Sequence, residues 1–202
     1  MCGIVAYIGS RAAPPILVEG LKRLEYRGYD SAGVAVIENG ALATARRVGK
    51  VKELDDERRS VGADGTTGIA HTRWATLGAP TEANAHPHAT DEGSIVHNGI
   101  IENFKELRAE VAAEGRAFQS ETDSEVVAHL ISMRIEAGDS PEDAARAVFP
   151  RLRGAFALAV AFRQHPGLLI GARLGSPLVV GQGDGEMFLG SAALAQAALT
   201  QR

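Results

Sequence analysis

Hydrophobic positions predict strands at the two ends of the chain and helices mainly between them. The run from Ile4 to Ile8 contains no charged residue, which is typical of a buried strand. A helical stripe follows Pro14 and Pro15 and ends around Glu25. Prolines are tolerated in a first turn because its amide groups have no partner within the helix. The chain is therefore expected to begin with a strand and a helix.

A hairpin is predicted next, because Asn39-Gly40 separates two apolar runs at residues 34–37 and 42–46. Asn-Gly favours the type I′ turn, in which both central residues have positive φ. The charged residues 50–59 predict a solvated helix or loop, to which we assign no function. Short strands are then predicted at residues 67–72 and 94–96.

Polar residues mark the starts of three further helices. Asn103 and Glu106 have the spacing of a capping box, as do Thr122 and Glu125. Ser140 precedes a helix that is expected to extend to about residue 152. Strand signals then return at residues 155–162, 168–172, 178–181 and 186–189, with turns at residues 165–167 and 183–185.

The order of these elements predicts the fold class. Strands come first, then helices, then strands again, without the regular alternation of a doubly wound parallel sheet. We therefore expect an α+β fold in which two mainly antiparallel sheets are flanked by helices. The length of 202 residues favours one large domain over two small ones.

Composition and charge indicate which binding partners and which cellular compartment to expect. The net charge of −4 gives no basic footprint for nucleic acid. A single cysteine excludes an internal disulfide framework, and the start of the chain lacks the pattern of a signal peptide. No apolar run approaches the roughly 20 residues that span a bilayer. We expect a cytoplasmic protein that binds small molecules or protein, with no nucleic acid and no membrane.

That single cysteine, Cys2, is placed where removal of Met1 would make it the N-terminal residue. An N-terminal cysteine carries both a thiol nucleophile and an α-amino group, whose ordinary pKa of about 7.7–8.0 suits a general base. Gly3 leaves the backbone open to a substrate. The alternative is that Cys2 is a small apolar residue near a chain end, since one cysteine without a visible partner is a weak signal.

A long connection from Arg73 to His88 is unusually rich in special residues. It contains the only tryptophan, Trp74, and two histidines, His86 and His88. Long ordered loops are often functional. The histidines could bind a metal, but no second cluster of cysteine or acidic ligands accompanies them, so hydrogen bonding within a packed loop is the favoured interpretation.

Two more positions allow a functional and a structural interpretation. Asn98-Gly99 lies where a strand leads to a helix, and a carboxamide beside a backbone N–H could form an oxyanion hole, although Asn-Gly is also a common turn. Asp123 is expected in the first turn of its helix, where an acid offsets the helix dipole. It would serve equally well as the partner of a substrate ammonium group. The residues alone leave both questions open.

Taken together, six blocks resemble one known family. The chain is similar to the glutaminase domain of the glutamine:fructose-6-phosphate aminotransferases (isomerizing), also called glucosamine-6-phosphate synthases, which are class II glutamine amidotransferases with an N-terminal nucleophile. The Cys-Gly start is shared by all class II amidotransferases, whereas the longer blocks are more specific. The resemblance covers nearly the whole chain and is carried by residues 2–5, 24–33, 71–76, 84–88, 97–103 and 121–123.

The resemblance implies a fold and a set of roles. The fold is the N-terminal nucleophile hydrolase fold, a four-layer αββα sandwich. The implied catalytic residues are Cys2 as nucleophile with its own amine as base, Asn98 and Gly99 as oxyanion hole, and Arg27 as a support for that centre. The implied substrate-binding residues are Arg73 for the α-carboxylate, assisted by Thr76, Asp123 for the α-ammonium, Trp74 at the ammonia outlet of a closing loop, and His86 as support for that loop.

The resemblance also implies a reaction, the absence of a cofactor or metal, and a domain organisation. L-Glutamine would be hydrolysed to glutamate and ammonia, and the ammonia would serve glucosamine-6-phosphate synthesis from fructose 6-phosphate. No cofactor and no metal are implied. Residues 1–202 would form the glutaminase domain, truncated at its C-terminus, while the isomerase domain, through which a homodimer could form, would be absent.

Three departures from the family pattern keep alternatives open. Leu77 replaces a usual histidine, Ala192 replaces a usual aspartate, and the chain stops at Arg202, where the family's glutaminase domain normally continues. In addition, an uncleaved Met1 would turn the proposed base into an amide nitrogen. One alternative is the glutaminase domain of another class II amidotransferase, of the asparagine synthetase type. The other is a catalytically silent binding or regulatory module.

Overall fold

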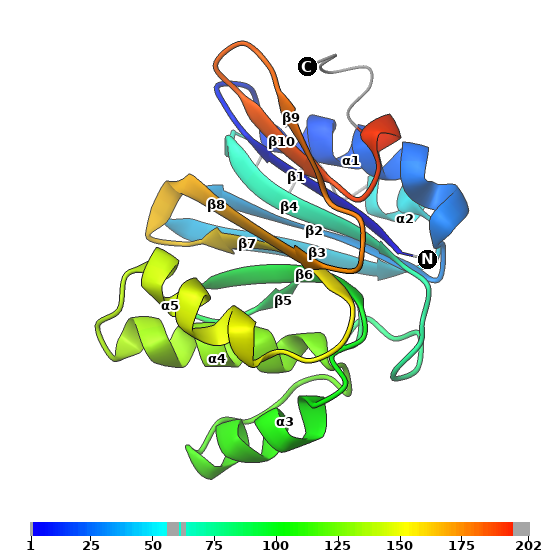
Figure 1. Ribbon diagram of the computed structural model, residues 1–202. Coiled ribbons are helices and arrows are strands. Elements are labelled where there is room, and N and C mark those ends of the chain that lie inside the picture. The colour runs from blue at the N-terminus through cyan, green and yellow to red at the C-terminus, as the bar shows by residue number, and fades with distance from the viewer. Residues whose placement is uncertain (1, 56–60, 62–63, 196–202) are drawn as a thin grey trace.

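The computed structural model describes residues 2–55, 61 and 64–195, and Figure 1 shows two β-sheets stacked face to face between helices. The expectation of an α+β sandwich with four layers is confirmed. Within the described residues, no helix is long and apolar enough to cross a membrane.

Six strands form the larger sheet, in the order β3-β2-β4-β1-β10-β9, with every neighbouring pair antiparallel. β1 and β4 lie in the middle of this sheet and pair with each other. The strands are β1 (Gly3–Ile8), β2 (Ser31–Glu38), β3 (Ala41–Val48), β4 (Thr67–Arg73), β9 (Val179–Gln182) and β10 (Met187–Gly190).

The smaller sheet has the order β5-β6-β7-β8 and is also antiparallel throughout. Its inner strand β6 ends in the Asn98-Gly99 pair that the sequence singled out. The strands are β5 (His88–Ala89), β6 (Gly93–Gly99), β7 (Phe156–Phe162) and β8 (His165–Leu174).

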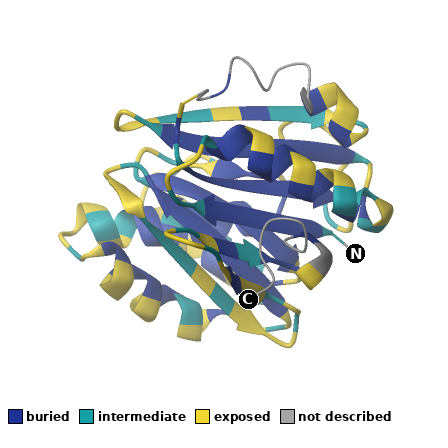
Figure 2. Cartoon of the chain, turned by 90° about the horizontal axis from the view of Figure 1, so that it is seen from above, coloured by how far each residue is buried: buried dark blue, intermediate teal, exposed yellow. Residues whose placement is uncertain are grey.

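Helices cover the outer face of each sheet. α1 (Ala13–Leu24) and α2 (Val51–Asp55) pack on the larger sheet, whereas α4 (Ser124–Glu136) and α5 (Pro141–Val148) cover the smaller one, with α3 (Phe104–Ala113) packed against α4. In Figure 2 these helices are dark blue on the side that faces a sheet and yellow on the side that faces solvent. The short 3-10 helices are η1 (Glu25–Arg27), η3 (Phe149–Arg151) and η4 (Ala193–Ala195).

The alternating side chains of β1 enter two different cores, which explains its uninterrupted apolar run. Ile4 and Ala6 lie between the sheets, while Val5 and Tyr7 belong to the core beneath α1. Successive side chains of a strand point to opposite faces, so a strand covered on both faces has no polar side. β1, which begins at Gly3, is therefore held rigidly immediately after Cys2.

Several predicted elements are confirmed in place. Asn39 and Gly40 form the expected hairpin turn with φ values of 51° and 75°. α1 begins with its prolines in the first turn and ends before Glu25, as expected. Ser140 caps α5, because its hydroxyl oxygen accepts the backbone N–H of Asp143 at 3.1 Å. Of the charged residues 50–59, Val51–Asp55 form α2, and residues 56–60 lie outside the described part of the chain.

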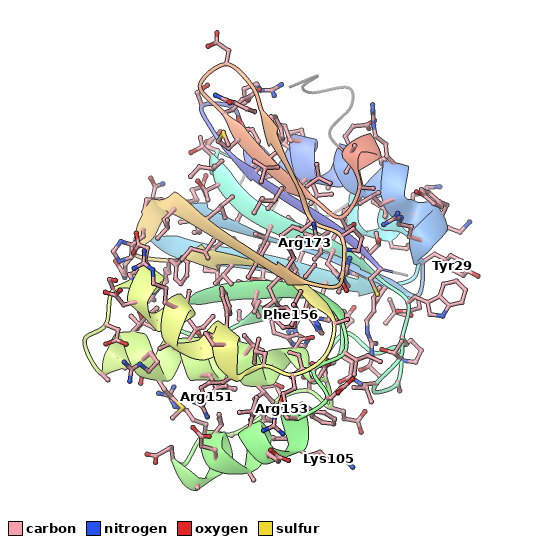
Figure 3. All side chains as sticks on the ribbon, in the orientation of Figure 1. Tyr29, Lys105, Arg151, Arg153, Phe156 and Arg173 are labelled. Carbon is pink, nitrogen blue, oxygen red and sulfur yellow. The ribbon has the colours of Figure 1, made fainter. Side chains whose placement is uncertain are left out.

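The capping box predicted at Asn103 is wrong. The Asn103 side chain makes no cap hydrogen bond to α3 and instead joins two residues before β7. It donates to the carbonyl of Arg151 and accepts the N–H of Arg153, both at 3.0 Å. Figure 3 shows Arg153 beside α3. Hydrogen bonds to backbone groups that are distant in the sequence therefore replace the predicted helix cap.

The capping box predicted at Thr122 is also wrong. The Thr122 hydroxyl contacts the His88 ring at 2.9 Å, and Glu125 accepts the backbone N–H groups of Gln119 and Ser120 instead of that of Thr122. The turn expected at residues 165–167 is displaced as well, because the chain turns at residues 163–164 and Pro166 lies within β8. β8 is an edge strand, where the missing N–H of proline is tolerated.

Candidate functional site

Three strand ends meet at one end of the sandwich. Gly3 pairs with Thr72, so Cys2 lies beside the point where β4 ends. The end of β6 crosses from the other sheet, and the Asn98 side-chain amide donates to the Cys2 carbonyl at 3.1 Å. The start of β1 lies at this end of the molecule in Figure 1. The residues singled out from the sequence therefore gather around the thiol.

The half-buried Cys2 thiol is paired with the backbone of Trp74. The Trp74 N–H donates to Sγ at 3.3 Å, and Sγ lies 3.6 Å from the Trp74 carbonyl oxygen. Burial raises the pKa of the Cys2 thiol, and the Trp74 N–H opposes that shift without cancelling it. At neutral pH the thiol therefore needs a base before it can attack.

Cys2 lies where two pockets meet, which we call the inner and the outer pocket. The outer pocket has a volume of about 420 Å³, whereas the inner pocket, at about 20 Å³, has room for little more than one water molecule. Cys2, Trp74, Thr76 and Gly99 line both. The inner pocket is also lined by Arg73, Leu77, His86, His97, Thr122, Asp123 and Ser124, and the outer one by Arg27, Asn98, Ile100, Ser176 and Pro177.

Arg73 is buried at the inner pocket and binds the loop that follows it. Its guanidinium donates to the carbonyl oxygens of Leu77, Gly78 and Ala79. Leu77, which stands where the resembled family usually has histidine, thus binds Arg73 through its backbone carbonyl. The Leu77 side chain also lines the inner pocket and adds no polar group there.

Asp123 contributes a buried carboxylate to the inner pocket. It lies directly before α4, at the N-cap position, yet makes no cap hydrogen bond. Its Oδ2 accepts the N–H of Ile101 at 2.8 Å, and its Oδ1 is 3.7 Å from His97 Nδ1. The inner pocket therefore contains one cationic and one anionic side chain, which can bind the two charged groups of an α-amino acid.

Asn98 and Gly99 face Cys2 from the other sheet. Gly99 has φ of +118°, and a Cβ atom there would lie 2.0 Å from the Ala155 carbonyl oxygen, so only glycine fits. The Asn98 carboxamide is held at both ends, with Nδ2 on the Cys2 carbonyl and Oδ1 3.0 Å from His71 Nε2. An amide N–H anchored beside a thiol can stabilise a developing oxyanion.

Arg27 and the Trp74 ring lie at the rim. Arg27 lines the outer pocket from η1 and donates to the Ser191 carbonyl at 3.2 Å. Ser191 also holds the start of β1, because its hydroxyl accepts the N–H of Ile4 at 3.0 Å. The half-exposed Trp74 ring packs edge-on against Tyr29, which Figure 3 labels at this end of the molecule.

Four buried histidines, His71, His86, His88 and His97, lie behind the pockets. Hydrogen bonding was expected for His86 and His88, and it is found only for His88, on Thr122. Among the described residues, neither ring nitrogen of His86 has a hydrogen-bond partner. Its ring instead packs at 4.3 Å from that of His71 and at 4.6 Å from that of His88. No group of three or more potential metal ligands occurs in the described part of the chain.

Sequence reasoning missed Asp30 and His71. The Asp30 carboxylate accepts the backbone N–H of Ala75 and the Ser31 hydroxyl, and so fixes the turn that presents the Trp74 N–H to Cys2. His71 touches Asn98. Both lie inside the blocks that carry the family resemblance, but nothing in their local pattern indicates a long-range partner.

A larger apolar groove lies elsewhere and has no comparable chemistry. It has a volume of about 460 Å³ and runs along β8, β9 and β10. Arg173, labelled in Figure 3, is the one charged side chain among the described residues that line it, and no nucleophile or carboxylate joins it. Size alone therefore does not identify the site.

Comparison with known proteins agrees with the motifs. The glutamine--fructose-6-phosphate aminotransferase (isomerizing) of Mesorhizobium japonicum is 56% identical over 200 residues, which are 99% of this chain and 33% of that protein. That of Zymomonas mobilis is 57% identical over 202 residues, 100% of this chain and again 33% of the relative. The chain thus spans about a third of the length of these curated relatives.

A solved structure shares the fold. The glutamine phosphoribosylpyrophosphate amidotransferase of B. subtilis superposes with a TM-score of 0.83 and 26% sequence identity, over 97% of this chain and 43% of that one. The model of the family described as "Glutamine amidotransferase domain" matches residues 71–198, which include Arg73, Asn98 and Asp123. Because this match covers more than half of the chain, the chain belongs to the glutamine amidotransferase domain family.

Proposed function

We propose that the chain hydrolyses L-glutamine to glutamate and ammonia, with Cys2 as nucleophile once Met1 has been removed. The α-amino group of Cys2 takes the thiol proton, and sulfur attacks the side-chain carboxamide carbon. The amine then returns the proton to the leaving nitrogen as the C–N bond breaks, which releases ammonia and leaves a thioester on Cys2. Water attacks the thioester, and glutamate and the free thiol are regenerated.

The observation that carries this proposal is the position of Cys2 between an inner pocket with opposite charges and an outer pocket with an amide donor. Glutamine would place its α-carboxylate at Arg73, assisted by Thr76, and its α-ammonium at Asp123. Its carboxamide would then reach the thiol. The family and the relatives, whose names contain glutamine, support this choice of substrate.

Asn98 and Gly99 would bind the oxyanion that forms during attack. One N–H of the Asn98 amide is used by the Cys2 carbonyl, and the other is available to the pocket that Asn98 lines. The Gly99 backbone N–H is the second donor. Arg27 supports this centre through Ser191, Trp74 covers the outlet for ammonia, and His86 supports the loop by ring packing.

Glutamine entry requires movement of the loop that begins at Trp74. The inner pocket is too small for an amino acid as it stands, and Trp74, Thr76 and Leu77 form one of its walls. These loop residues are exposed or half-buried. Opening of this wall would admit glutamine, and reclosure would exclude bulk water from the thioester until ammonia has left.

The larger protein would use the ammonia. Since the relatives are named for glutamine and fructose 6-phosphate, we propose that the chain is the glutaminase domain of such an enzyme and supplies ammonia for glucosamine-6-phosphate synthesis. A following isomerase domain would bind the sugar and could hold a homodimer together. A free thiol nucleophile suits a reducing cytoplasm.

The decisive experiment starts from protein whose N-terminus has been verified by intact mass. A diazoketone analogue of glutamine should add once, at Cys2, and Cys2→Ala should abolish both labelling and turnover. Labelling elsewhere, or processed protein without turnover, would contradict the proposal and favour a silent binding module. On a full-length chain, transfer to aspartate instead of fructose 6-phosphate would favour the asparagine synthetase alternative.

A further inference from the structure

His71 lies in the interior between the two sheets and touches the end of β6. It comes from β4 of the larger sheet and is only 1% exposed. Its Nε2 atom is 2.9 Å from the His97 carbonyl oxygen and 3.0 Å from Asn98 Oδ1. One ring nitrogen therefore meets two atoms of the neighbouring sheet.

The chemistry of these partners fixes the proton on His71. A backbone carbonyl can only accept, so Nε2 must carry the hydrogen, and the Asn98 atom that faces Nε2 must then be its oxygen. At its other end, the Asn98 carboxamide meets the Cys2 carbonyl, which again can only accept and so requires the NH₂ group. Both contacts select the same orientation of the carboxamide.

We propose that His71 is a positioning residue that holds the Asn98 carboxamide with its NH₂ group toward Cys2. This inference rests on the proposed glutaminase function. Rotation of the carboxamide by 180° would place its oxygen against the Cys2 carbonyl and its NH₂ against the His71 N–H. A rotated Asn98 would then present an oxygen to the developing oxyanion, where repulsion replaces stabilisation.

The surroundings keep His71 a neutral donor. Burial lowers its pKa to about 3, although the hydrogen bonds to Asn98 and to the His97 carbonyl act in the opposite direction. His86 packs on the ring at 4.3 Å, and neighbouring His97 and His88 also disfavour protonation. The Asp123 carboxylate contacts His97 and not His71. A neutral N–H donor thus orients Asn98 without adding charge near the reacting carbonyl.

The main test is a double-mutant cycle with processed protein and glutamine. His71→Phe keeps an aromatic ring and removes the donor, so kcat should fall by about 10-fold or more, within the roughly 10²–10³-fold loss expected when the Asn98 donor itself is removed. KM should change by less than about twofold. In an Asn98→Ala background, His71→Phe should cause no further loss of kcat. Multiplicative losses would overturn the positioning role.

His88→Phe is the matched control, because His88 is equally buried and also packs on His86 but bonds Thr122 instead of Asn98. Its effect on kcat should multiply with that of Asn98→Ala, whatever its size. Rescue of kcat by His71→Gln, which restores an N–H donor, is also expected. Failure of Gln to exceed Phe in kcat would count against the proposal.

A spectroscopic measurement on the unsubstituted protein does not depend on folding of the variants. Imidazole ¹⁵N shifts should show His71 as the neutral Nε2–H tautomer throughout pH 6–8. An Nδ1–H tautomer, or titration in this range, would overturn the inference. Wild-type protein without glutamine turnover would overturn the proposed function, whereas turnover with multiplicative His71 and Asn98 effects would remove only the role of His71.

Discussion

At the scale of single residues, Asp123 combines a structural and an electrostatic contribution. The residue is 5% exposed and its carboxylate accepts the Ile101 N–H, so it ties the start of α4 to the segment after β6. The same carboxylate lines the inner pocket together with Arg73. A buried carboxylate with few hydrogen-bond donors is well suited to a substrate ammonium group.

Replacement of Asp123 separates the two contributions. Asp123→Asn keeps an acceptor for Ile101 and removes the charge, so KM for glutamine should rise by at least about 30-fold, equivalent to roughly 2 kcal/mol or more. Asp123→Ala should raise KM similarly and also lower the melting temperature, because the Ile101 N–H loses its partner. Steady-state kinetics would give KM for the two variants, and thermal melts would give their melting temperatures. An unchanged KM in Asp123→Asn would make the carboxylate purely structural.

Asn98 should affect rate more than affinity. Negative charge develops on the carboxamide oxygen only as sulfur adds, so a donor there stabilises the transition state more than bound glutamine. Asn98→Ala should lower kcat by about 10²- to 10³-fold with little change in KM. Full turnover combined with a lower melting temperature would instead identify Asn98 as a structural residue.

Residue types at the site could be predicted better than their partners. Cys2, Asn98 and Asp123 were singled out because few residue types can perform nucleophilic attack, oxyanion binding or ammonium binding. The Trp74 N–H as a donor to the thiol could not be predicted, since every residue except proline carries a backbone N–H. The two capping boxes predicted from local spacing were also wrong, because the side chains of Asn103 and Thr122 form hydrogen bonds with residues far away in the sequence.

At the scale of elements, the connection between β4 and β5 is held by two sets of hydrogen bonds. Arg73 binds the carbonyls of residues 77–79, and the buried Asn84, from the far half of the connection, also binds Ala79. The Asn84 amide donates to the Ala79 carbonyl at 3.0 Å and to the Glu121 carboxylate at 3.1 Å, while its oxygen accepts the Glu121 N–H at 2.8 Å. Asn84 thus joins the loop after Arg73 to the segment before Asp123.

Loss of this link should weaken glutamine binding. Asn84→Ala frees both segments, so Arg73 and Asp123 lose their fixed separation, and KM should rise by about 10-fold while kcat falls less. The control is Glu82→Ala in the same loop, whose exposed ion pair with Arg47 should contribute less than about 1 kcal/mol. Equal KM values for the two variants would show that Asn84 does not set this geometry.

Elements defined by local chemistry were predicted well, whereas those that depend on neighbours were not. The Asn39-Gly40 hairpin and the Ser140 cap follow from short-range backbone preferences, and both occur as expected. Pro166 suggested a turn but lies in an edge strand. Whether a strand lies at an edge is decided by sheet order, which one sequence does not reveal.

At the scale of the whole molecule, the fold brings together residues that are far apart in the chain. Cys2 directly precedes β1 of the larger sheet, Asn98 lies in β6 of the smaller sheet, and a buried cluster of histidines connects those sheets behind them. The family resemblance predicted the four layers, and the residue pattern predicted two antiparallel sheets. The histidine cluster was not predicted, because His71, His86, His88 and His97 meet only after both sheets have packed.

This cluster should make folding sensitive to acid. Burial lowers the pKa of each of the four histidines, to about 3 for His71 and His88. Asp123 opposes this shift at His97 and Glu125 opposes it at His88, whereas Arg73 reinforces it at His86 and His88. Since the folded-state values lie below the ordinary value near 6.5, the unfolded chain binds more protons as pH falls, and stability decreases from pH 6.5 toward pH 3.

The expected slope is steep enough to measure. Well below pH 6.5, a histidine that stays neutral in the folded state contributes about 1.4 kcal/mol per pH unit. His71 and His88, whose pKa values are about 3, therefore contribute roughly 3 kcal/mol per unit together, and His86 and His97 add to this in the same direction. Urea unfolding between pH 7 and pH 4 should show a stability that decreases gently near pH 7 and at this limiting slope below about pH 5.5, which is a large loss against a typical total stability of about 5–15 kcal/mol. His88→Gln should reduce the slope below about pH 5.5 by roughly 1.4 kcal/mol per pH unit, because one buried imidazole is removed. His165→Gln, on an exposed position of β8, should leave the slope unchanged, since that side chain meets water in both states. A stability that stays constant from pH 7 to pH 5 would show that the cluster takes up protons without unfolding.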